Sequence, residues 1–528
     1  MRAPRQAFVK VTEAGAATKV AVEARSSGTA GKVVNPIWKK CVGAGRAAEA
    51  LRADFQRQLE LAQREIGFEY LRCHGPLCDE MMVYREAGGE PVHNWQYLDM
   101  VYDHWLSVGV RPFVELSFMP YELASGDETA FWWRGNITPP KDWGRWERLV
   151  REMVGHFVER YGLPEVRRWY FEVWNEPDLS FFWKGADFEG YLELYGRTAS
   201  AVKSVAPELR VGGPATSGAE GTTAQRPTFG ERFLAACSER SLPLDFFSTH
   251  PYPTFHPVDV AGDGAMGWLG PDRLQTDLER IDKLLAAHGY AHLERHLTEW
   301  NSSPSPRDPS HDTAFMAPFI VRNNLMARDR LGSLSFWVVS DIFEEGRLGD
   351  GPFHGGFGLL NVQSLKKPSF HGYWFLSRLG HAELASGDSF IATRREDGTL
   401  ATLVWNYCHY RTSARLAAGA RDPYELFEQG EPRCFELSLT GVEGPVRVAT
   451  TRFDRSHGSV YDVWAEMGKP SHLSRHDVEV LRDGAQLATT VERTRIGGEG
   501  LRREVSVPPH GVVLIEVSPV AGSPMWAL

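Results

Sequence analysis

The chain has 528 residues, 42% hydrophobic and 24% charged, with a formal net charge of -10. This length exceeds one simple core and predicts two or three units, one of them large enough to be a barrel. An acidic chain without a lysine- and arginine-rich run lacks the basic face that nucleic-acid binding requires. No stretch approaches the roughly 18 apolar residues of a membrane span, and the first twenty residues lack the apolar segment of a secretory signal. We therefore expect no nucleic-acid or membrane partner and a cytoplasmic location.

The six cysteines are too few for a disulfide scaffold in a chain of this length, and none forms a CxxC pair. We expect reduced thiols packed in the core.

Short apolar or β-branched runs alternate with longer segments of helical period from about residue 33 to residue 380. This alternation is typical of βα units and a parallel sheet. Eight strands are predicted, at 33–39, 68–74, 111–118, 169–175, 209–215, 245–252, 296–300 and 334–341. Eight strands close a (β/α)8 TIM barrel, and an open doubly wound sheet is the structural alternative.

The segments between these strands have amphipathic spacing. In 146–162, for example, Trp146, Leu149, Val150, Met153 and Phe157 recur at helical intervals, and Gly162 is a predicted stop. Segments 93–109 and 271–289 follow the same plan.

The helical pattern ends near residue 380, and turn-punctuated strands follow. They predict an accessory antiparallel β-sandwich, to which the alternating N-terminal segment adds strands. The predicted domains are 1–27 with the sandwich, 28–360 as the catalytic barrel and 361–528 as the C-terminal sandwich, with the last barrel helix near 368–380.

Two glutamates stand at predicted strand ends, Glu176 after 169–175 and Glu299 in 296–300. In such barrels the loops after the strands build the active site. Glycosidic bond hydrolysis requires this pair, one carboxyl protonated to assist the leaving oxygen and one ionised to attack the sugar; a separation of about 5 to 5.5 Å gives retention. The sequence therefore predicts a glycosidase.

Several ordered motifs resemble one family. They are CVGAGRA, LRCHG, WNEPDLSFFW, HPYP, TEWNSS, FWVVSDIFEE and PPHGVVLIEVS. Together they look like glycoside hydrolase family 39, which contains β-xylosidases and α-L-iduronidases, within the clan of retaining (β/α)8 glycosidases.

The resemblance implies that Glu176 is the general acid/base and Glu299 the nucleophile. It also implies that Asn175 bonds the sugar 2-hydroxyl and that Tyr252 orients Glu299. The remaining substrate contacts that we predict are His74, His250, Trp337, Glu344, Phe118 and Phe181.

Three other features receive structural interpretations. Glu115 and Glu172 lie within strands, where we expect them to pair with an arginine such as Arg72. The G-x-G-x-x-A pattern at 43–48 is explained by a glycine-rich first βα turn, so no dinucleotide cofactor is expected. No metal is expected either, because HExxH is absent and His74 and His250 come without a third matched ligand.

The acidic loop DIFEEG, with Asp341, Glu344 and Glu345, would repel a uronate and accept hydrogen bonds from neutral hydroxyls. This favours a retaining exo-β-1,4-xylosidase that releases D-xylose from the non-reducing end of xylo-oligosaccharides, acting on β-xylosides in xylan degradation. The alternatives are an α-L-iduronidase, an α-L-arabinosidase, a retaining endo-glycanase and a non-catalytic sugar-binding protein.

Overall fold

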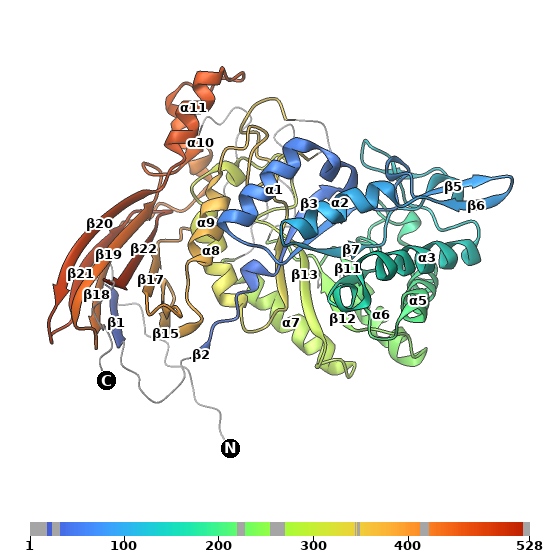
Figure 1. The fold of residues 1–528 in the computed structure, drawn as a ribbon, viewed down its shortest axis with the longest axis horizontal. Helices are drawn as coiled ribbons and strands as arrows, with labels where there is room; N and C mark the ends of the chain where they lie inside the picture. Colours follow the sequence, from blue (N-terminus) through green and yellow to red (C-terminus); the bar gives the residue numbers. More distant parts are fainter. Residues whose placement is uncertain are drawn as a thin grey trace.

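The structure is a computed structural model, and it describes residues 18–23, 32–218, 227–253, 270–343, 345, 349–411 and 422–520. A barrel and a β-sandwich lie side by side, and a helical hairpin projects from the sandwich (Figure 1). No helix in these ranges combines the length and the apolarity needed to cross a bilayer.

Eight parallel strands form a closed barrel, which confirms the predicted fold class. They are β3 (Cys41–Arg46), β4 (Tyr70–His74), β7 (Arg111–Glu115), β10 (Tyr170–Glu172), β11 (Arg210–Thr216), β12 (Phe246–Thr249), β13 (Glu294–Trp300) and β14 (Ser333–Phe336). Closure leaves no exposed strand edge and brings the C-terminal strand ends into one ring. We call this ring the mouth.

One principal helix follows each barrel strand. The eight are α1 (Ala53–Glu65), α2 (Gln96–Ser107), α3 (Trp143–Tyr161), α5 (Phe188–Val205), α6 (Phe229–Glu239), α7 (Arg273–Ala287), α8 (Met316–Ala327) and α9 (Pro368–Ser377). Helix α3 shows how the sequence sets its limits. Asp142 caps its first turn by accepting a hydrogen bond from the Arg145 amide, and Gly162, at φ 82°, ends the helix as predicted.

The prediction of the first barrel strand was wrong. Residues 37–39 form a 3-10 helix after Pro36, and the strand is β3, which contains the glycine pattern that we had placed in a turn. A Cβ on Gly43 would lie 2.4 Å from Trp337 Cε3, and one on Gly45 would lie 2.4 Å from Glu49 Oε2. The glycines therefore make room for side chains at the mouth.

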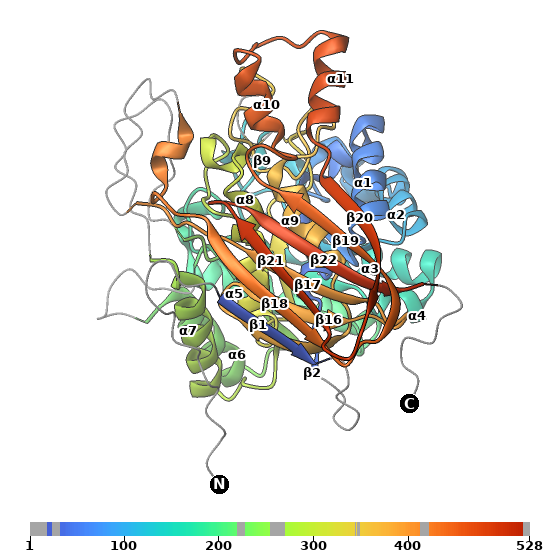
Figure 2. The ribbon, with the colours of Figure 1, turned by 90° about the vertical axis from the view of Figure 1, so that its left-hand side faces the viewer.

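The sandwich consists of a seven-stranded and a three-stranded sheet. The first contains, in spatial order, β2 (Lys32–Val33), β15 (Ala382–Gly387), β16 (Phe390–Arg394), β17 (Leu400–Trp405), β22 (Val512–Pro519), β19 (Gly444–Phe453) and β20 (Ala488–Ile496). The second contains β1 (Thr18–Glu23), β18 (Arg433–Thr440) and β21 (Leu501–Val507). Figure 2 shows β1 beside β18, with which it pairs in parallel. The domain limits at residues 27 and 360 stay predictions.

Smaller elements decorate both units. Hairpins β5–β6 (Tyr84–Ala87, Glu90–His93) and β8–β9 (Thr129–Ala130, Gly135–Asn136) extend barrel loops, and the short helix α4 (Leu163–Val166) follows α3. Helices α10 (Val460–Glu466) and α11 (Arg475–Gly484) form the projecting hairpin between β19 and β20.

The barrel and the sandwich share one continuous apolar core. Phe315, just before α8, packs against Phe427 and Tyr410 of the sandwich, with ring centroids 4.4 and 4.6 Å apart. A second apolar cluster fills the space between the two sheets. The sandwich is thus fixed against the barrel.

Replacing Gly43 by alanine should lower the thermal unfolding midpoint, because the added methyl group displaces Trp337. Overpacking of this kind costs about 1–3 kcal/mol. Gly155, within α3, has open space at its Cβ position, so Gly155→Ala is the matched control and should stabilise by about 0.5–1 kcal/mol. Calorimetry of the three proteins checks this, and an unchanged midpoint in Gly43→Ala would refute the packing argument.

Candidate active site

Strand β10 leads to Glu176 through an unusual backbone. Pairing ends at Glu172, and both Trp174 (φ 71°) and Glu176 (φ 43°) adopt left-handed conformations. Such residues cost about 1–3 kcal/mol and persist only where their surroundings hold them. Here the Trp174 indole donates to the Phe182 carbonyl at 2.8 Å, and the Glu176 amide donates to the Ala215 carbonyl at 2.9 Å. These bonds direct the Glu176 carboxyl into the mouth.

Glu299, near the end of β13, accepts two hydrogen bonds. Arg72 Nη1 donates to its Oε1 at 2.9 Å, and the Tyr252 hydroxyl donates to its Oε2 at 3.1 Å. Both donors favour the ionised carboxylate.

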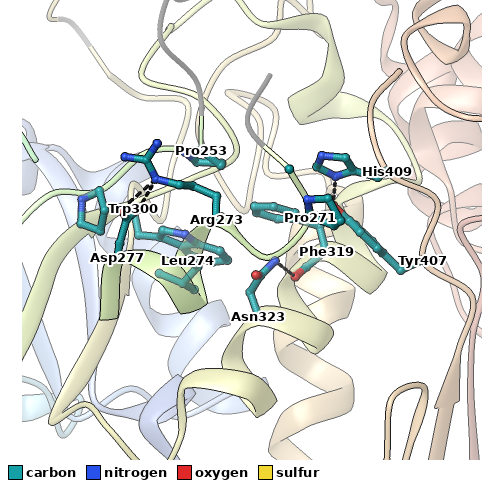
Figure 3. Close-up of a pocket in the computed structure, with 12 residues that line it drawn as sticks. Pro253, Pro271, Arg273, Leu274, Asp277, Trp300, Phe319, Asn323, Tyr407 and His409 are labelled. Atoms are coloured by element: carbon teal, nitrogen blue, oxygen red, sulfur yellow. Dashed lines mark hydrogen bonds and ion pairs between the residues drawn. The ribbon is translucent and has the colours of Figure 1, made fainter. Parts of the chain in front are cut away.

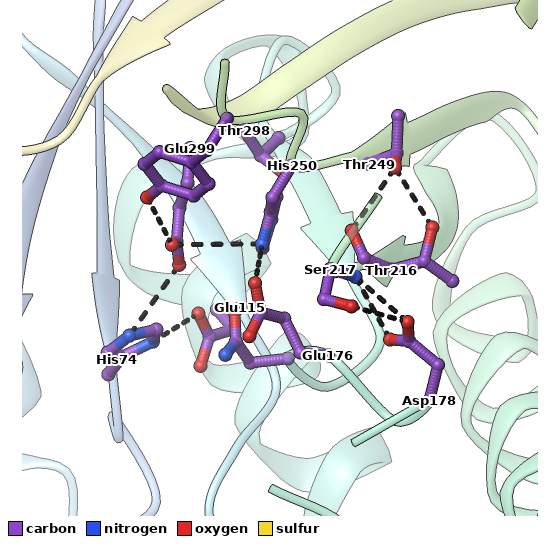
Figure 4. Close-up of polar contacts among 12 residues, drawn as sticks. His74, Glu115, Glu176, Asp178, Thr216, Ser217, Thr249, His250, Thr298 and Glu299 are labelled. Carbon is purple, nitrogen blue, oxygen red and sulfur yellow. Dashed lines mark hydrogen bonds and ion pairs between the residues drawn. The ribbon is translucent and has the colours of Figure 1, made fainter. Parts of the chain in front are cut away.

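His250 lies between the two glutamates (Figure 4). Its Nδ1 is 2.9 Å from Glu176 Oε1 and 3.7 Å from Glu299 Oε2. These three groups have atoms within 4.8 Å of one another. The carboxyls are thus too close for the 6.5–9.5 Å spacing of inverting glycosidases, and the geometry favours retention.

Arg72 pairs with further acids below Glu299. It lies 2.6 Å from Glu172 and 2.8 Å from Glu115, and it also donates to Asn175 Oδ1 at 2.8 Å. All of these side chains are buried, so the cation balances carboxylates that would otherwise be costly to enclose. The predicted pairing of Glu115 and Glu172 with Arg72 is confirmed.

His74, on β4, connects this cluster to the loop after β14. Its Nδ1 lies 2.8 Å from Glu115, and its Nε2 lies 3.2 Å from Glu345 Oε1 and 3.6 Å from Glu299. The Trp337 ring packs against His74 at a centroid distance of 4.8 Å.

Aromatic side chains form one wall of the mouth. Phe118 is fully buried and packs edge-on against His74 at 6.1 Å, whereas Phe181 is 52% exposed and packs on Phe182 at 4.9 Å. Phe131, which was not predicted, stacks on His74 at 5.8 Å and contacts Phe181. Apolar ring faces of this kind suit sugar binding.

The two glutamates differ in electrostatic environment. Burial, the Glu299 charge and Asp178 hold the pKa of Glu176 well above its usual range. Burial also raises the pKa of Glu299, but Arg72 and His74 oppose that rise. Glu176 therefore keeps its proton when Glu299 is ionised, as an acid and nucleophile pair requires.

The flanking groups support this division. Burial and then Glu299 hold the pKa of Tyr252 well above its usual range, so its hydroxyl stays a donor. For His74, burial disfavours the cation, but Glu115, Glu345 and Glu299 outweigh it and raise the pKa. Burial raises the pKa of Glu345 to about 7, against the effect of His74.

The structure brings most predicted site residues together. Glu176, Glu299, Asn175, His74, His250, Tyr252, Trp337 and Phe118 converge at the mouth, and Phe181 lies at its exposed rim. Glu344 lies outside the described residues. The Asn175 amide Nδ2 is buried and finds no hydrogen-bond partner among the described residues, so it is available to a ligand.

Asp341 was predicted to accept sugar hydroxyls, and that interpretation was wrong. It is buried against Lys367 Nζ at 3.1 Å, and it accepts the Gly358 amide at 2.6 Å. Its charge is needed to compensate a buried lysine, so it anchors the loop instead of facing the mouth.

The described residues of the segment after β14 (341–343, 345 and 349–358), which we call the β14 loop, are held by the barrel and the sandwich together. Lys367 Nζ also lies 2.6 Å from Asp312 and donates to the Gly356 carbonyl at 2.7 Å. Phe353 of this loop packs on Trp464 of α10, at a ring distance of 5.3 Å. The sandwich therefore supports the loop that carries Glu345.

Sequence reasoning missed Thr298 and Asp178 as well as Phe131. Asp178 accepts from the Ser217 hydroxyl at 2.6 Å, and Thr298 bonds both Glu172 and His250. The run Phe131-Trp132-Trp133 in a long loop was an available signal, because three adjacent aromatics outside a strand rarely lack a packing partner. Thr298 had no such signal.

A separate small cavity is lined by residues of the barrel and of the sandwich (Figure 3). Pro251 and Pro253, which flank Tyr252, line it together with Trp300, Phe319 and Tyr407. Neither catalytic candidate reaches it, and we assign it to packing between the barrel and the sandwich.

The spacing of Glu176, His250 and Glu299 would admit a cation. We assign these groups to proton chemistry instead, because Glu299 is already bonded to the Arg72 cation and to Tyr252. Nothing in this arrangement requires a cofactor.

A (β/α)8 barrel with one protonated and one ionised glutamate at retaining distance defines a glycoside hydrolase. Residues 18–499 match the family model described as glycosyl hydrolases family 39, and the chain belongs to this family.

Several proteins of similar sequence align with nearly the whole chain. A β-xylosidase of Geobacillus stearothermophilus is 39% identical over 492 residues, covering 92% of this chain and 93% of its own length. A β-xylosidase of Caldicellulosiruptor saccharolyticus is 37% identical over 488 residues, 92% of this chain and 96% of its own. The crystal structure of a monomeric β-xylosidase from Caulobacter crescentus CB15 superposes with a TM-score of 0.87 at 31% identity, covering 96% of this chain and all of that one.

Replacing Tyr252 by phenylalanine should move the acidic limb of the pH profile of glycoside hydrolysis to higher pH. The hydroxyl at 3.1 Å stabilises ionised Glu299, so its loss raises the pKa of the group that must be deprotonated to attack. Plots of kcat/KM against pH for an aryl glycoside check this. Tyr290→Phe, in the turn between α7 and β13, is the control, and an acidic limb that stays in place in Tyr252→Phe would contradict the assigned role of Tyr252.

Proposed function

We propose that the protein is a retaining exo-β-1,4-xylosidase that releases D-xylose from the non-reducing end of xylo-oligosaccharides. The observation that carries this proposal is the pair Glu176 and Glu299, whose oxygens lie within 4.8 Å of each other. Glu176 is bonded to His250, whereas Glu299 is bonded to the Arg72 cation. The β-xylosidases that match over nearly the whole chain support the substrate class.

In the first step, Glu299 attacks the anomeric carbon while Glu176 protonates the departing oxygen. Arg72 and Tyr252 hold the attacking carboxylate. The free amide of Asn175 suits a hydrogen bond to the sugar 2-hydroxyl, a contact that strengthens in the oxocarbenium-like transition state. The product is a covalent glycosyl-enzyme on Glu299.

In the second step, Glu176 acts as a base. It removes a proton from water, which attacks the glycosyl-enzyme and restores Glu299. Two displacements at one carbon retain the configuration.

The neighbours of the sugar site support a neutral glycone. Glu345 lies 3.2 Å from His74 at the mouth, where a carboxyl accepts hydrogen bonds from hydroxyls and, in its ionised form, repels a uronate. Glu176 and Glu299 are only 7% and 5% exposed, which favours a closed pocket for a chain end over an open cleft. These features weigh against an α-L-iduronidase and an endo-glycanase; an α-L-arabinosidase activity remains the second candidate because its neutral glycone meets the same contacts.

We also propose a role in xylan degradation and a cytoplasmic location. The six cysteines are all free thiols, five of them buried, which fits a reducing compartment.

Azide should distinguish the two glutamates by stereochemistry. Glu299→Ala should lose nearly all β-xyloside hydrolysis, and added azide should give the α-xylosyl azide by one displacement. Glu176→Ala should lose about 10²–10⁴-fold on poor leaving groups, and azide should give the β-xylosyl azide by two displacements. Proton NMR of the products checks this, and identical azide anomers from both variants would refute the assigned roles.

The unmodified protein should produce xylose alone from xylohexaose at early times. It should hydrolyse an aryl β-D-xyloside well and the corresponding α-L-iduronide negligibly, because Glu345 opposes the carboxylate. Chromatography of early products and initial rates on the glycoside panel, including an α-L-arabinofuranoside, measure both. Early xylobiose or xylotriose would indicate endo action, and preferred cleavage of the iduronide would overturn the glycone assignment.

A further inference from the structure

A chain of hydrogen bonds lies behind the proposed acid/base. Glu172 Oε1 is 2.8 Å from Thr298 Oγ1, Thr298 Oγ1 is 2.9 Å from His250 Nε2, and His250 Nδ1 is 2.9 Å from Glu176 Oε1. We propose that Glu172 and Thr298 are positioning residues that fix the tautomer of His250, so that His250 accepts the Glu176 proton in a hydrogen bond and never donates to Glu176. This inference rests on the proposed role of Glu176.

Glu172 sets the direction in which these hydrogen bonds are donated. Its other oxygen accepts from Arg72 Nε at 2.6 Å, so this side chain is a carboxylate held by a cation. A carboxylate has no hydrogen to offer, and the single hydroxyl hydrogen of Thr298 must therefore point toward Glu172. The opposite orientation would place two oxygen lone pairs 2.8 Å apart.

Thr298 then faces His250 with a lone pair. The bond at 2.9 Å needs a hydrogen, which has to sit on His250 Nε2. Burial, Arg72 and His74 hold the pKa of His250 well below its usual range, so the ring is neutral. Its Nδ1 accordingly carries no hydrogen, and the hydrogen between Nδ1 and Glu176 belongs to the carboxyl.

This arrangement has a consequence in both displacements. Before the first, it stabilises the protonated form of Glu176, which is the form that assists departure of the leaving group. After the first, ionised Glu176 faces a bare nitrogen lone pair and has no donor in His250, so it remains a strong base toward water. The other charged or titratable groups facing this pair are Glu299, Asp178, His74, Arg72 and the neutral Tyr252. Their charges are present whichever tautomer His250 adopts.

Glu172→Gln should reverse the direction of these hydrogen bonds while conserving the shape of the side chain. Arg72 requires an oxygen at its 2.6 Å contact, so the new amide must turn its NH₂ group toward Thr298. Thr298 would then accept from the amide and donate to His250 Nε2. The ring hydrogen would move to Nδ1, where it would bond and stabilise ionised Glu176.

Thr298→Val should instead interrupt the chain and leave the His250 tautomer unrestrained. Thr298→Ser keeps the hydroxyl and is the conservative rescue. These two variants decide the question if Glu172→Gln, which removes one charge next to Arg72, does not fold.

The first measurement is the tautomer itself, by nitrogen-15 NMR of full-length protein labelled at histidine, with the His250 signals identified by their loss in His250→Ala. We expect hydrogen on Nε2 in the unmodified protein and in Thr298→Ser, and hydrogen on Nδ1 in Glu172→Gln. Hydrogen on Nε2 in Glu172→Gln would overturn the proposal. This readout does not depend on the substrate, so it stays decisive even if no xyloside is hydrolysed, a result that would sink the proposed function alone.

The second measurement is the dependence of rate on the leaving group. In Glu172→Gln and Thr298→Val, kcat/KM for phenyl β-xyloside should fall about tenfold or more, whereas 2,4-dinitrophenyl β-xyloside, which needs no acid, should change less than about twofold. The basic limb for the phenyl substrate should move to lower pH by about one unit, because the pKa of Glu176 falls when its ionised form gains a donor. Equal losses for both substrates with an unmoved limb would show a merely structural role.

Discussion

The guanidinium of Arg72 lies beneath the mouth, and the chemistry above depends on it. It pairs with Glu115, Glu172 and Glu299 within 2.9 Å and orients Asn175. Enclosing carboxylates in a barrel is unfavourable by several kcal/mol for each uncompensated charge. Because one planar cation with five donors serves all of them, the barrel can hold an ionised nucleophile away from water.

The same cation creates the difference between the two glutamates. Glu299 is bonded to the Arg72 cation, whereas Glu176 is bonded to His250, which is neutral. Two chemically identical side chains therefore receive different proton affinities from their neighbours. The left-handed backbone at Trp174 and Glu176, held by its hydrogen bonds, places Glu176 at the distance from Glu299 where that difference is useful.

Much of this arrangement follows from the sequence because barrels impose it. Parallel strands must end at one rim, so the polar residues that follow separate apolar runs meet there, and Glu176, Glu299, His250 and Tyr252 were predicted for that reason. The first strand was misplaced because β3 contains two glycines and has low β-propensity. Gly45 makes room for the nearby Glu49, but Gly43 makes room for Trp337, which is distant in the sequence. Thr298 is likewise unremarkable in LTEW, since only closure of the barrel brings it to Glu172 of β10 and to His250 after β12. Asp341 looked like a ligand group because its buried partner, Lys367, is 26 residues away.

The β14 loop is anchored separately from the catalytic strands. The proposed bond-breaking groups rest on Arg72 inside the barrel, whereas the loop with Glu345 rests on Lys367, Asp312 and α10 of the sandwich. The residues that select the sugar and the residues that carry out the reaction are thus anchored by different parts of the structure. Evolution can rebuild the loop, or shift the sandwich beneath it, to admit another glycone while the strands continue to perform the same two displacements.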